Sequence, residues 1–102
     1  MSATQFLPVK VLKGLWRHPE YGGGLVGDLD RDRLLAMGPN DKLYLDSLAM
    51  EIDEIGIYEP LEVFIASNGE AFLNNGHHRA VVAMELRLET VPVVFKREDD
   101  EE

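Results

Sequence analysis

The apolar pattern of this chain changes its period at the tripeptide Asn74-Asn75-Gly76. Before it, alternate apolar positions predict a strand over 61–65 and, after the turn at 67–69, a return strand over 71–73. The Asn-Gly pair in that turn suits the two positive φ angles of a type I′ hairpin. After the tripeptide, apolar residues recur at helical spacing and predict a helix of about three turns from His77. A hairpin therefore leads through a glycine directly into a helix.

The remaining elements complete a mixed α/β order of strand, helix, helix, strand, strand, helix, strand. They are a strand over Gln5 to Leu12 with an edge signal at Pro8, a loop over Gly14 to Gly27, a helix from Asp30 to Met37 ended by Gly38-Pro39, a helix opened by Asn40 or Asp41 and ended by Gly56, and a strand over Thr90 to Phe95. In the longer helix, a stripe of Tyr44, Leu48, Ile52 and Ile55 predicts the core face. The order predicts an α/β (mixed α+β) fold, a small mixed sheet packed by about three helices.

The length of 102 residues allows one domain, which we place at 1–97. The last five residues, 98–102, are all acidic and predict a disordered tail. The net charge is −9, and −9 + 5 = −4 remains without the tail, so autonomous binding to nucleic acid is not expected. The absence of cysteine excludes disulfides and thiolate chemistry. With no membrane-spanning apolar run and no secretory signal, a cytoplasmic location is expected.

The strongest candidate site is the pentapeptide Asn75-Gly76-His77-His78-Arg79. Unpaired backbone N–H groups and the helix dipole make a helix N-terminus an anion site. Gly76 permits a tight turn and close approach of a phosphate to the backbone. Arg79 adds a permanent positive charge that fits phosphate oxygens, and His77 and His78 donate hydrogen bonds or titrate near neutrality. These four residues predict a phosphate-binding turn.

A purely structural role for the histidines is the alternative. Adjacent helical side chains point about 100° apart, so one imidazole is expected to pack against the sheet, and His78 is a candidate for a buried, hydrogen-bonded histidine. The same angle argues against joint metal ligation by the pair, and no metal site is predicted.

The stretch from Leu48 to Phe95 resembles the ParB/sulfiredoxin superfamily, often described as the ParB-like nuclease domain. Its matching parts, in order, are I-D-E-I-G-I, E-P-L-E-V, a hairpin, N-G-H-H-R-A-V-V-A and E-T-V-P-V-V-F. The resemblance implies that Gly76, His77, His78 and Arg79 bind the phosphates of ATP or CTP, usually with Mg²⁺. It also makes His77 and Glu59 candidates for catalytic roles, with Glu62 as a further acid near the substrate or a metal. The alternative is that Glu59 is an exposed loop acid and Glu62 an outward-facing strand residue.

The departures from that family pattern narrow the expected activity. The reductase branch carries a cysteine directly after the glycine, where this chain has His77, so sulfinic-acid reduction is excluded. The partition branch carries a second arginine after the turn and a DNA-binding domain downstream, and here Ala80-Val81-Val82 follows. What remains is nucleotide or phosphate binding, with nucleotide hydrolysis or phosphotransfer as an open question.

Two other classes of function stay open. One is a non-catalytic acidic module, as in a phage or bacterial accessory protein, that binds a basic protein partner. The other is a nuclease, which would need a basic patch assembled from Lys10, Lys13, Arg17 and Arg79. The run Gly22-Gly23-Gly24-Leu25-Val26-Gly27 matches the G-x-G-x-x-G pattern of dinucleotide-binding sites. That pattern binds a dinucleotide only between a strand and a helix, and no strand is predicted before this run. It is predicted to be a loop, with a half-buried Trp16 beside it.

Overall fold

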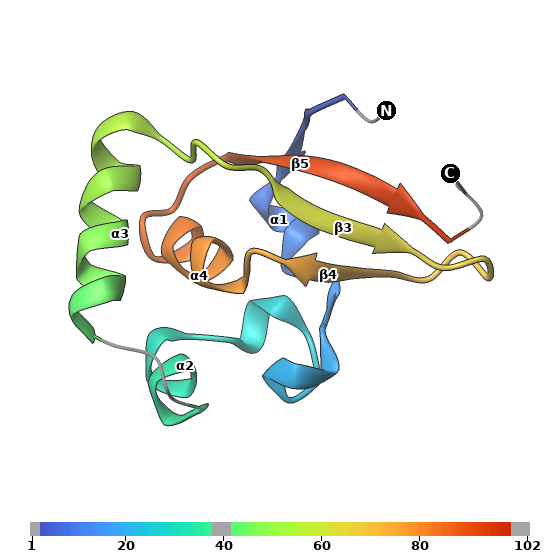
Figure 1. Cartoon of the computed structure of the whole chain (residues 1–102), viewed down its shortest axis with the longest axis horizontal. Coiled ribbons are helices and arrows are strands. Elements are labelled where there is room, and N and C mark those ends of the chain that lie inside the picture. Colours follow the sequence, from blue (N-terminus) through green and yellow to red (C-terminus); the bar gives the residue numbers. More distant parts are fainter. Residues whose placement is uncertain (1–2, 38–41, 99–102) are drawn as a thin grey trace.

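One mixed sheet organises the part of the chain that the computed structural model describes, residues 3–37 and 42–98 (Figure 1). Its strands are β1 (Gln5–Pro8), β2 (Trp16–Arg17), β3 (Leu61–Ile65), β4 (Ala71–Asn75) and β5 (Thr90–Arg97), in the spatial order β1-β5-β3-β4-β2. The central strand β3 runs parallel to β5 and antiparallel to β4, while β1 pairs with β5 antiparallel and β2 with β4 parallel. The predicted mixed α/β architecture is confirmed.

Four α-helices and two short 3₁₀ turns connect the described strands. They are α1 (Val9–Leu12), α2 (Arg31–Met37), α3 (Lys42–Ile55) and α4 (His77–Glu85), with 3₁₀ turns at Pro19–Tyr21 and Val26–Asp28. The prediction of about three helices missed α1, because Val9 and Val11 were read as part of a strand that in fact ends at Pro8. The predicted loop over 14–27 likewise contains β2, whose two residues are too few to give a periodic signal.

Helix α4 lies at the centre of the fold and is buried on two sides. Ala80 and Ala83 pack with the sheet residues Leu61, Leu73 and Val93, which are all fully buried. On its other side, Val81 packs with a second cluster, Leu29, Leu34 and Leu45, contributed by α2, α3 and the segment before α2. The start of α4 is therefore held between the sheet and the helical layer (Figure 1).

The face of α3 that packs into the core differs from the predicted stripe. Leu45 and Ile52 are buried, whereas Tyr44 is 53% and Ile55 67% exposed. The four-residue spacing of the predicted stripe drifts around a helix, and only Ile52 of that stripe is buried. The prediction that all four stripe residues form core is wrong.

The hairpin between β3 and β4 is present, but its turn is not type I′. The N–H of Gly69 donates to the carbonyl of Ala66, and the N–H of Ala66 donates to the carbonyl of Glu70. Gly69 has a φ of +92°, while Asn68 has no positive φ. One left-handed glycine after an ordinary turn is the pattern of a three-residue loop with a bulge. The prediction of the hairpin is confirmed, and that of the turn type is wrong.

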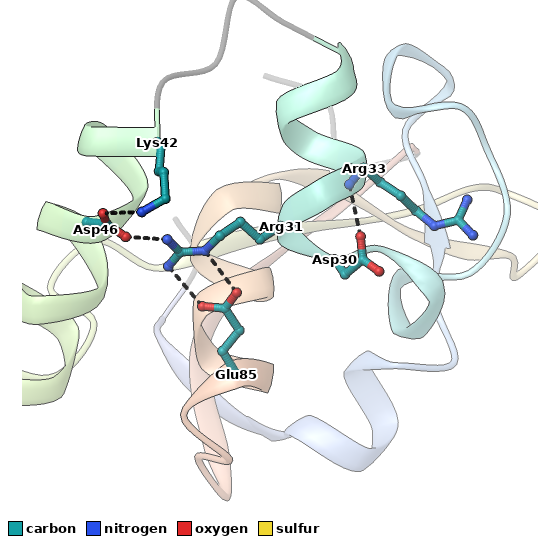
Figure 2. A network of polar contacts seen from close by, with 6 residues as sticks. All are labelled: Asp30, Arg31, Arg33, Lys42, Asp46 and Glu85. Atoms are coloured by element: carbon teal, nitrogen blue, oxygen red, sulfur yellow. Dashed lines mark hydrogen bonds and ion pairs between the residues drawn. The ribbon is translucent and has the colours of Figure 1, made fainter.

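Helix ends follow the predicted signals where they are described. The Asp30 carboxylate accepts from the N–H of Arg33 at 2.9 Å, which caps α2 (Figure 2). Gly56 ends α3 with a φ of +83°. The predicted signals at Gly38-Pro39 and at Asn40 or Asp41 lie outside the described residues, as does the predicted tail beyond Glu98. Glu98 itself continues the β3–β5 pairing, since its N–H donates to the carbonyl of Ile65.

An ion-pair network holds α2, α3 and α4 together (Figure 2). Arg31, at the start of α2, donates through Nε and Nη2 to both carboxylate oxygens of Glu85 on α4 at 3.1 Å, and through Nη1 to Asp46 on α3. Lys42 donates to the other oxygen of Asp46 at 3.2 Å. The Arg31 guanidinium, followed by Lys42, holds the pKa of the Asp46 carboxyl below its usual range. One guanidinium thus fixes the position of α4 relative to both neighbouring helices.

Candidate functional site

The turn from β4 into α4 is built on a glycine that has no room for a side chain. Gly76 has a φ of +105°, and a Cβ placed there would lie 2.7 Å from Leu61 Cγ. No side chain caps the first turn of α4, so its leading N–H groups have no side-chain acceptor. The glycine therefore serves packing and chain reversal, and it supplies no side-chain cap to the helix start.

His77 is buried and uncharged at neutral pH. Its side chain stacks on the Tyr21 ring with centroids 3.9 Å apart, and its Nε2 accepts from the N–H of His18 at 3.2 Å. Burial, followed by the neighbouring charges of His18, His78 and Arg17, lowers the pKa of His77 to about 4. The expectation that His77 titrates near neutrality is wrong, because the ring packs inside the protein with its Nε2 lone pair already in use.

His78 lies between two tyrosine rings at the same helix start. Tyr21 and Tyr44 both meet it edge-on, with centroids 6.1 and 5.7 Å away. Partial burial, and then the charge of Arg79, lower its pKa. Of the two histidines, His77 is thus the buried one, and His78 is the one nearer to α3.

Arg79 turns toward the segment that enters β3. Its Nη1 donates to the backbone carbonyls of Glu59 at 2.5 Å and Pro60 at 3.0 Å. The nearest carboxylate oxygen, on Glu59, is 4.0 Å away, and that side chain is 82% exposed. Arg79 is therefore positioned by neutral backbone groups, without a tight ion pair that would offset its charge.

A small pocket of about 260 Å³ opens beside Arg79. Its walls come from α3 and from the segment between α3 and β3: Tyr44, Leu48, Glu51, Ile52, Gly56, Ile57, Tyr58, Glu59 and Arg79. It is smaller than the roughly 300–1,000 Å³ of sites that enclose a drug-sized ligand, so it suits one part of a larger molecule. Tyr44 and Leu48 of the stripe predicted as core line this pocket, together with the buried Ile52.

Arg17 is predicted from the sequence only as part of the basic patch of a nuclease, not as a residue of the phosphate-binding turn. It is only 9% exposed, and one of its nitrogens, Nη1, donates to the carbonyl of Leu25 at 3.2 Å. Its Nε is buried without any hydrogen-bond partner, and no carboxylate of the described residues pairs with it. Its charge contributes to the lowered pKa of His77, at the first position of α4.

The glycine run at 22–24 explains how Arg17 is buried. All three glycines have positive φ angles, and a Cβ at Gly24 would lie 3.3 Å from Arg17 Nη2. The backbone of Arg17 also donates to the carbonyl of Gly24 at 2.8 Å. The run therefore wraps a guanidinium, and this pairing of a glycine run with a preceding arginine was the signal in the sequence. Trp16 beside it is 49% exposed, so it is more exposed than the half-buried side chain that the sequence predicts.

The remaining predicted residues are not brought together at this site. Glu62 accepts from Asn74 Nδ2 at 2.6 Å and lies 4.0 Å from Lys96, which is a structural contact across the sheet. Lys10 and Lys13 line a different pocket, to which neither Arg17 nor Arg79 contributes. The basic patch required for a nuclease is therefore not assembled among these four residues.

The described residues contain neither a metal-ligand cluster nor a membrane-spanning helix. In residues 3–37 and 42–98 there is no group of three or more His, Asp or Glu side chains arranged to hold a metal ion. Over the same ranges, no helix has both the length and the apolar character needed to cross a membrane.

The order of elements and the glycine-led α4 define a ParB/sulfiredoxin-like fold, as the resemblance implied. Similar solved structures are the chromosome-partitioning protein ParB from Caulobacter crescentus in complex with CTP-γ-S (TM-score 0.63, 24% identity) and sulfiredoxin from Arabidopsis thaliana (TM-score 0.61, 19% identity). A Pnob8-like ParB-N domain is also similar (TM-score 0.60, 15% identity).

These likenesses span nearly all of this chain but unequal shares of the others. They cover 96%, 93% and 97% of this chain, against 46% of the Caulobacter ParB chain, 85% of the sulfiredoxin chain and 31% of the Pnob8-like chain. The chain thus spans about half the length of the ParB structure it matches. The sequence matches no protein-family model and no curated protein.

Proposed function

We propose that this protein binds a nucleotide, or another phosphate-bearing ligand, at the start of α4. The phosphates would face the uncapped first turn of the helix, where backbone N–H groups and the helix dipole favour an anion. Arg79 supplies a positive charge at this end of the helix that no tight ion pair offsets. The Caulobacter ParB structure contains a CTP analogue, which makes CTP the first ligand to test.

Arg17 is the observation that carries this proposal. A guanidinium that is buried without an ionic partner is costly, since desolvation of a charge is repaid only by good pairing. Its Nε has no acceptor among the described residues, and the next residue, His18, donates its backbone N–H to His77, the first residue of α4. An anionic ligand at the helix start would provide the missing negative charge, which is why a phosphate group fits better there than a neutral ligand.

The pocket beside Arg79 offers contacts for the rest of the ligand. Tyr44 and Tyr58 present aromatic rings that suit a nucleobase or sugar. Glu51 and Glu59 line the same pocket, and Mg²⁺ bound to phosphates commonly uses one or two carboxylates. We therefore assign these two glutamates to Mg²⁺, which would offset the charge of the phosphates when a metal–nucleotide complex binds.

In a hydrolysis or phosphotransfer reaction, Glu59 is better placed than His77 to accept a proton. The Glu59 carboxylate is exposed at the mouth of the pocket, 4.0 Å from the Arg79 guanidinium. His77 is neutral, buried and already accepts a hydrogen bond, so it positions the His18 backbone and the Tyr21 ring. Both residues were predicted to be catalytic, and we now propose this role for Glu59 only.

Thermal shift with CTP, ATP, GTP and UTP, each with and without Mg²⁺, tests the binding. We expect at least one nucleotide to raise the Tm of the wild type, and Arg79→Ala to abolish that rise. Arg17→Met should also abolish it, yet leave the ligand-free protein as stable or more stable, because an unpaired buried charge is replaced by an apolar side chain of similar length.

Arg33→Ala is the matched control, since it removes a positive charge from the exposed side of α2 and should leave the nucleotide response unchanged. Absence of a shift with every nucleotide in the wild type would contradict the proposal. So would a shift that survives in both the Arg79→Ala and Arg17→Met variants.

A further inference from the structure

The segment after α4 contains the one non-glycine residue with a positive φ among the described residues, Arg87 at +56°. The N–H of Leu88 donates to the carbonyl of Ala83 at 3.0 Å, and the N–H of Arg87 donates to the carbonyl of Met84 at 3.2 Å. These two bonds form a Schellman motif, in which the left-handed position is usually glycine. Backbone geometry alone therefore favours glycine at 87, and the chain has an exposed arginine there.

Arg87 shares a surface pocket with two lysines from the other end of the sequence. The pocket has a volume of about 780 Å³ and is lined by Pro8, Val9, Lys10, Lys13, Met84, Arg87, Leu88, Glu89 and Thr90. Lys10 and Lys13 are three residues apart, from α1 to the residue that follows it, and so point to the same side. Val9 and Leu12 of α1 pack with Ala80 and Ala83, which fixes α1 beside α4.

None of the three cations of this pocket has a side-chain partner among the described residues. In residues 3–37 and 42–98, the side chains of Lys10, Lys13 and Arg87 make no hydrogen bond or ion pair. Among the residues that the structure describes, Glu89 is the only acid that lines the pocket, so the local formal charge is +3 − 1 = +2. Such a charge stands out in a chain whose net charge is −9.

We propose that this pocket, formed by Lys10, Lys13 and Arg87, is a second anion site that takes a small ligand bearing a phosphate group. A phosphate monoester carries nearly two negative charges at neutral pH, which matches the local charge. The arginine offers a forked donor for the phosphate oxygens, and the two lysines offer point charges. The apolar walls provided by Val9, Met84 and Leu88 suit the carbon skeleton of the ester.

The overall charge of the molecule favours a small anion over a long polyanion. A nucleic acid extends beyond the pocket and meets the acidic remainder of the surface, where repulsion opposes binding. A small phosphate ester meets only the local field within a Debye length, about 8 Å at physiological salt. This site is separate from the one proposed for nucleotides, since the two pockets have no lining residue in common.

The test uses pyrophosphate and glycerol 3-phosphate as probes in the Arg79→Ala background, so that the start of α4 does not contribute. Two-dimensional amide NMR should show saturable shifts at Lys10, Lys13 and Arg87. Arg87→Ala and Arg87→Gly should both weaken binding about tenfold, as expected for one charge-assisted hydrogen bond. Arg97→Ala removes the same charge at the far end of β5, roughly 23 Å from Thr90 of the pocket, and should not weaken it.

The two substitutions at 87 separate binding from folding. Both remove the guanidinium, but only glycine relieves the left-handed backbone, so Arg87→Gly should have a Tm roughly 4 °C or more above that of Arg87→Ala. Equal loss of binding in the two variants, despite that difference in stability, supports the site.

Three results would overturn the inference. They are an absence of saturable amide shifts at 10, 13 and 87, binding that is as strong in the Arg87 variants as in Arg97→Ala, and a response to an acidic peptide or to duplex DNA without a response to either phosphate probe. Because the background lacks Arg79, none of these results bears on nucleotide binding at the start of α4.

Discussion

Among single residues, Gly76 has the most demanding backbone position in the site. Gly76→Ala should reduce the free energy of unfolding by about 3 kcal/mol, because a new Cβ meets Leu61 and the φ of +105° is unfavourable for alanine. Urea denaturation measures this loss. Gly69→Ala is a matched control: its φ is +92°, but a Cβ there has no atom within 4 Å.

The control variant should lose only the backbone contribution, about 1 kcal/mol. The difference between the two variants isolates the contact with Leu61. Equal losses would mean that β3 moves away from the new methyl group, and the packing argument for this glycine would then be incorrect.

His77 is expected to make the stability of the protein sensitive to mild acid. Its pKa falls from 6.5 to about 4 on folding, so the unfolded chain binds a proton more readily than the folded one. The contribution of neutral His77 is fully present above about pH 6.5 and is lost as the pH falls toward 4. His77→Gln keeps an acceptor for the His18 N–H and does not titrate.

Thermal denaturation of both proteins between pH 7.5 and pH 5 gives the comparison, over a range above most carboxyl pKa values. The Tm of the wild type should fall more steeply than that of His77→Gln. Parallel curves would show that the buried imidazole accepts a proton without cost, in conflict with its burial against Tyr21.

At the scale of elements, the contacts of Arg31 determine how the helical layer is assembled. Arg31→Met should lower the Tm, because α2 loses its ion pairs to both α3 and α4. The loss should be smaller than for Gly76→Ala, since the charges involved are partly exposed. Arg33→Met, on the same short helix but without a side-chain ion pair in the described residues, is the control.

The stabilisation that this ion-pair network provides should depend on ionic strength and on pH. The difference in Tm between wild type and Arg31→Met should shrink at high ionic strength and below about pH 3.8, the ordinary pKa of the Asp46 carboxyl. The lowered pKa of Asp46 means that its contribution is present above that pH and lost below it. A difference that is insensitive to both conditions would indicate that the aliphatic part of Arg31, not its charge, matters.

Elements with a strong local signal could be predicted from sequence, and those set by long-range contacts could not. The period-2 strand β3, the stop at Gly56 and the helix from His77 all depend on residues adjacent in the chain. Helix α1 depends instead on packing against α4, and the two-residue β2 depends on pairing with β4.

The residues of the candidate site likewise divide into those with a local sequence signal and those placed by long-range contacts. Gly76 and Arg79, which we propose for the nucleotide site, could be named from the sequence, because a glycine before a helix and a basic first turn are local features. It did not locate Arg17, which joins the site through a strand pairing and a glycine loop that wraps its side chain. The sequence also predicts Tyr44 in the core, because helical spacing of apolar residues does not show whether they face the core or line a pocket.

At the scale of the whole molecule, burial is divided between two clusters that meet at α4. The sheet cluster includes Leu61, Leu73 and Val93, and the helical cluster includes Leu34 and Leu45. Because α4 contributes to both, the fold cannot separate its sheet from its helical layer without exposing that helix. The proposed nucleotide site is thus attached to the most buried helix of the described chain.

The length of α4 also determines how two bound anions would influence each other. Its nine residues span about 14 Å, with Arg79 near one end and Arg87 just past the other. Two phosphates held at those ends would be separated by more than the screening distance in physiological salt, and by less than it in dilute buffer. Occupancy of one end would then oppose occupancy of the other at low ionic strength, and the two would become independent as salt is added.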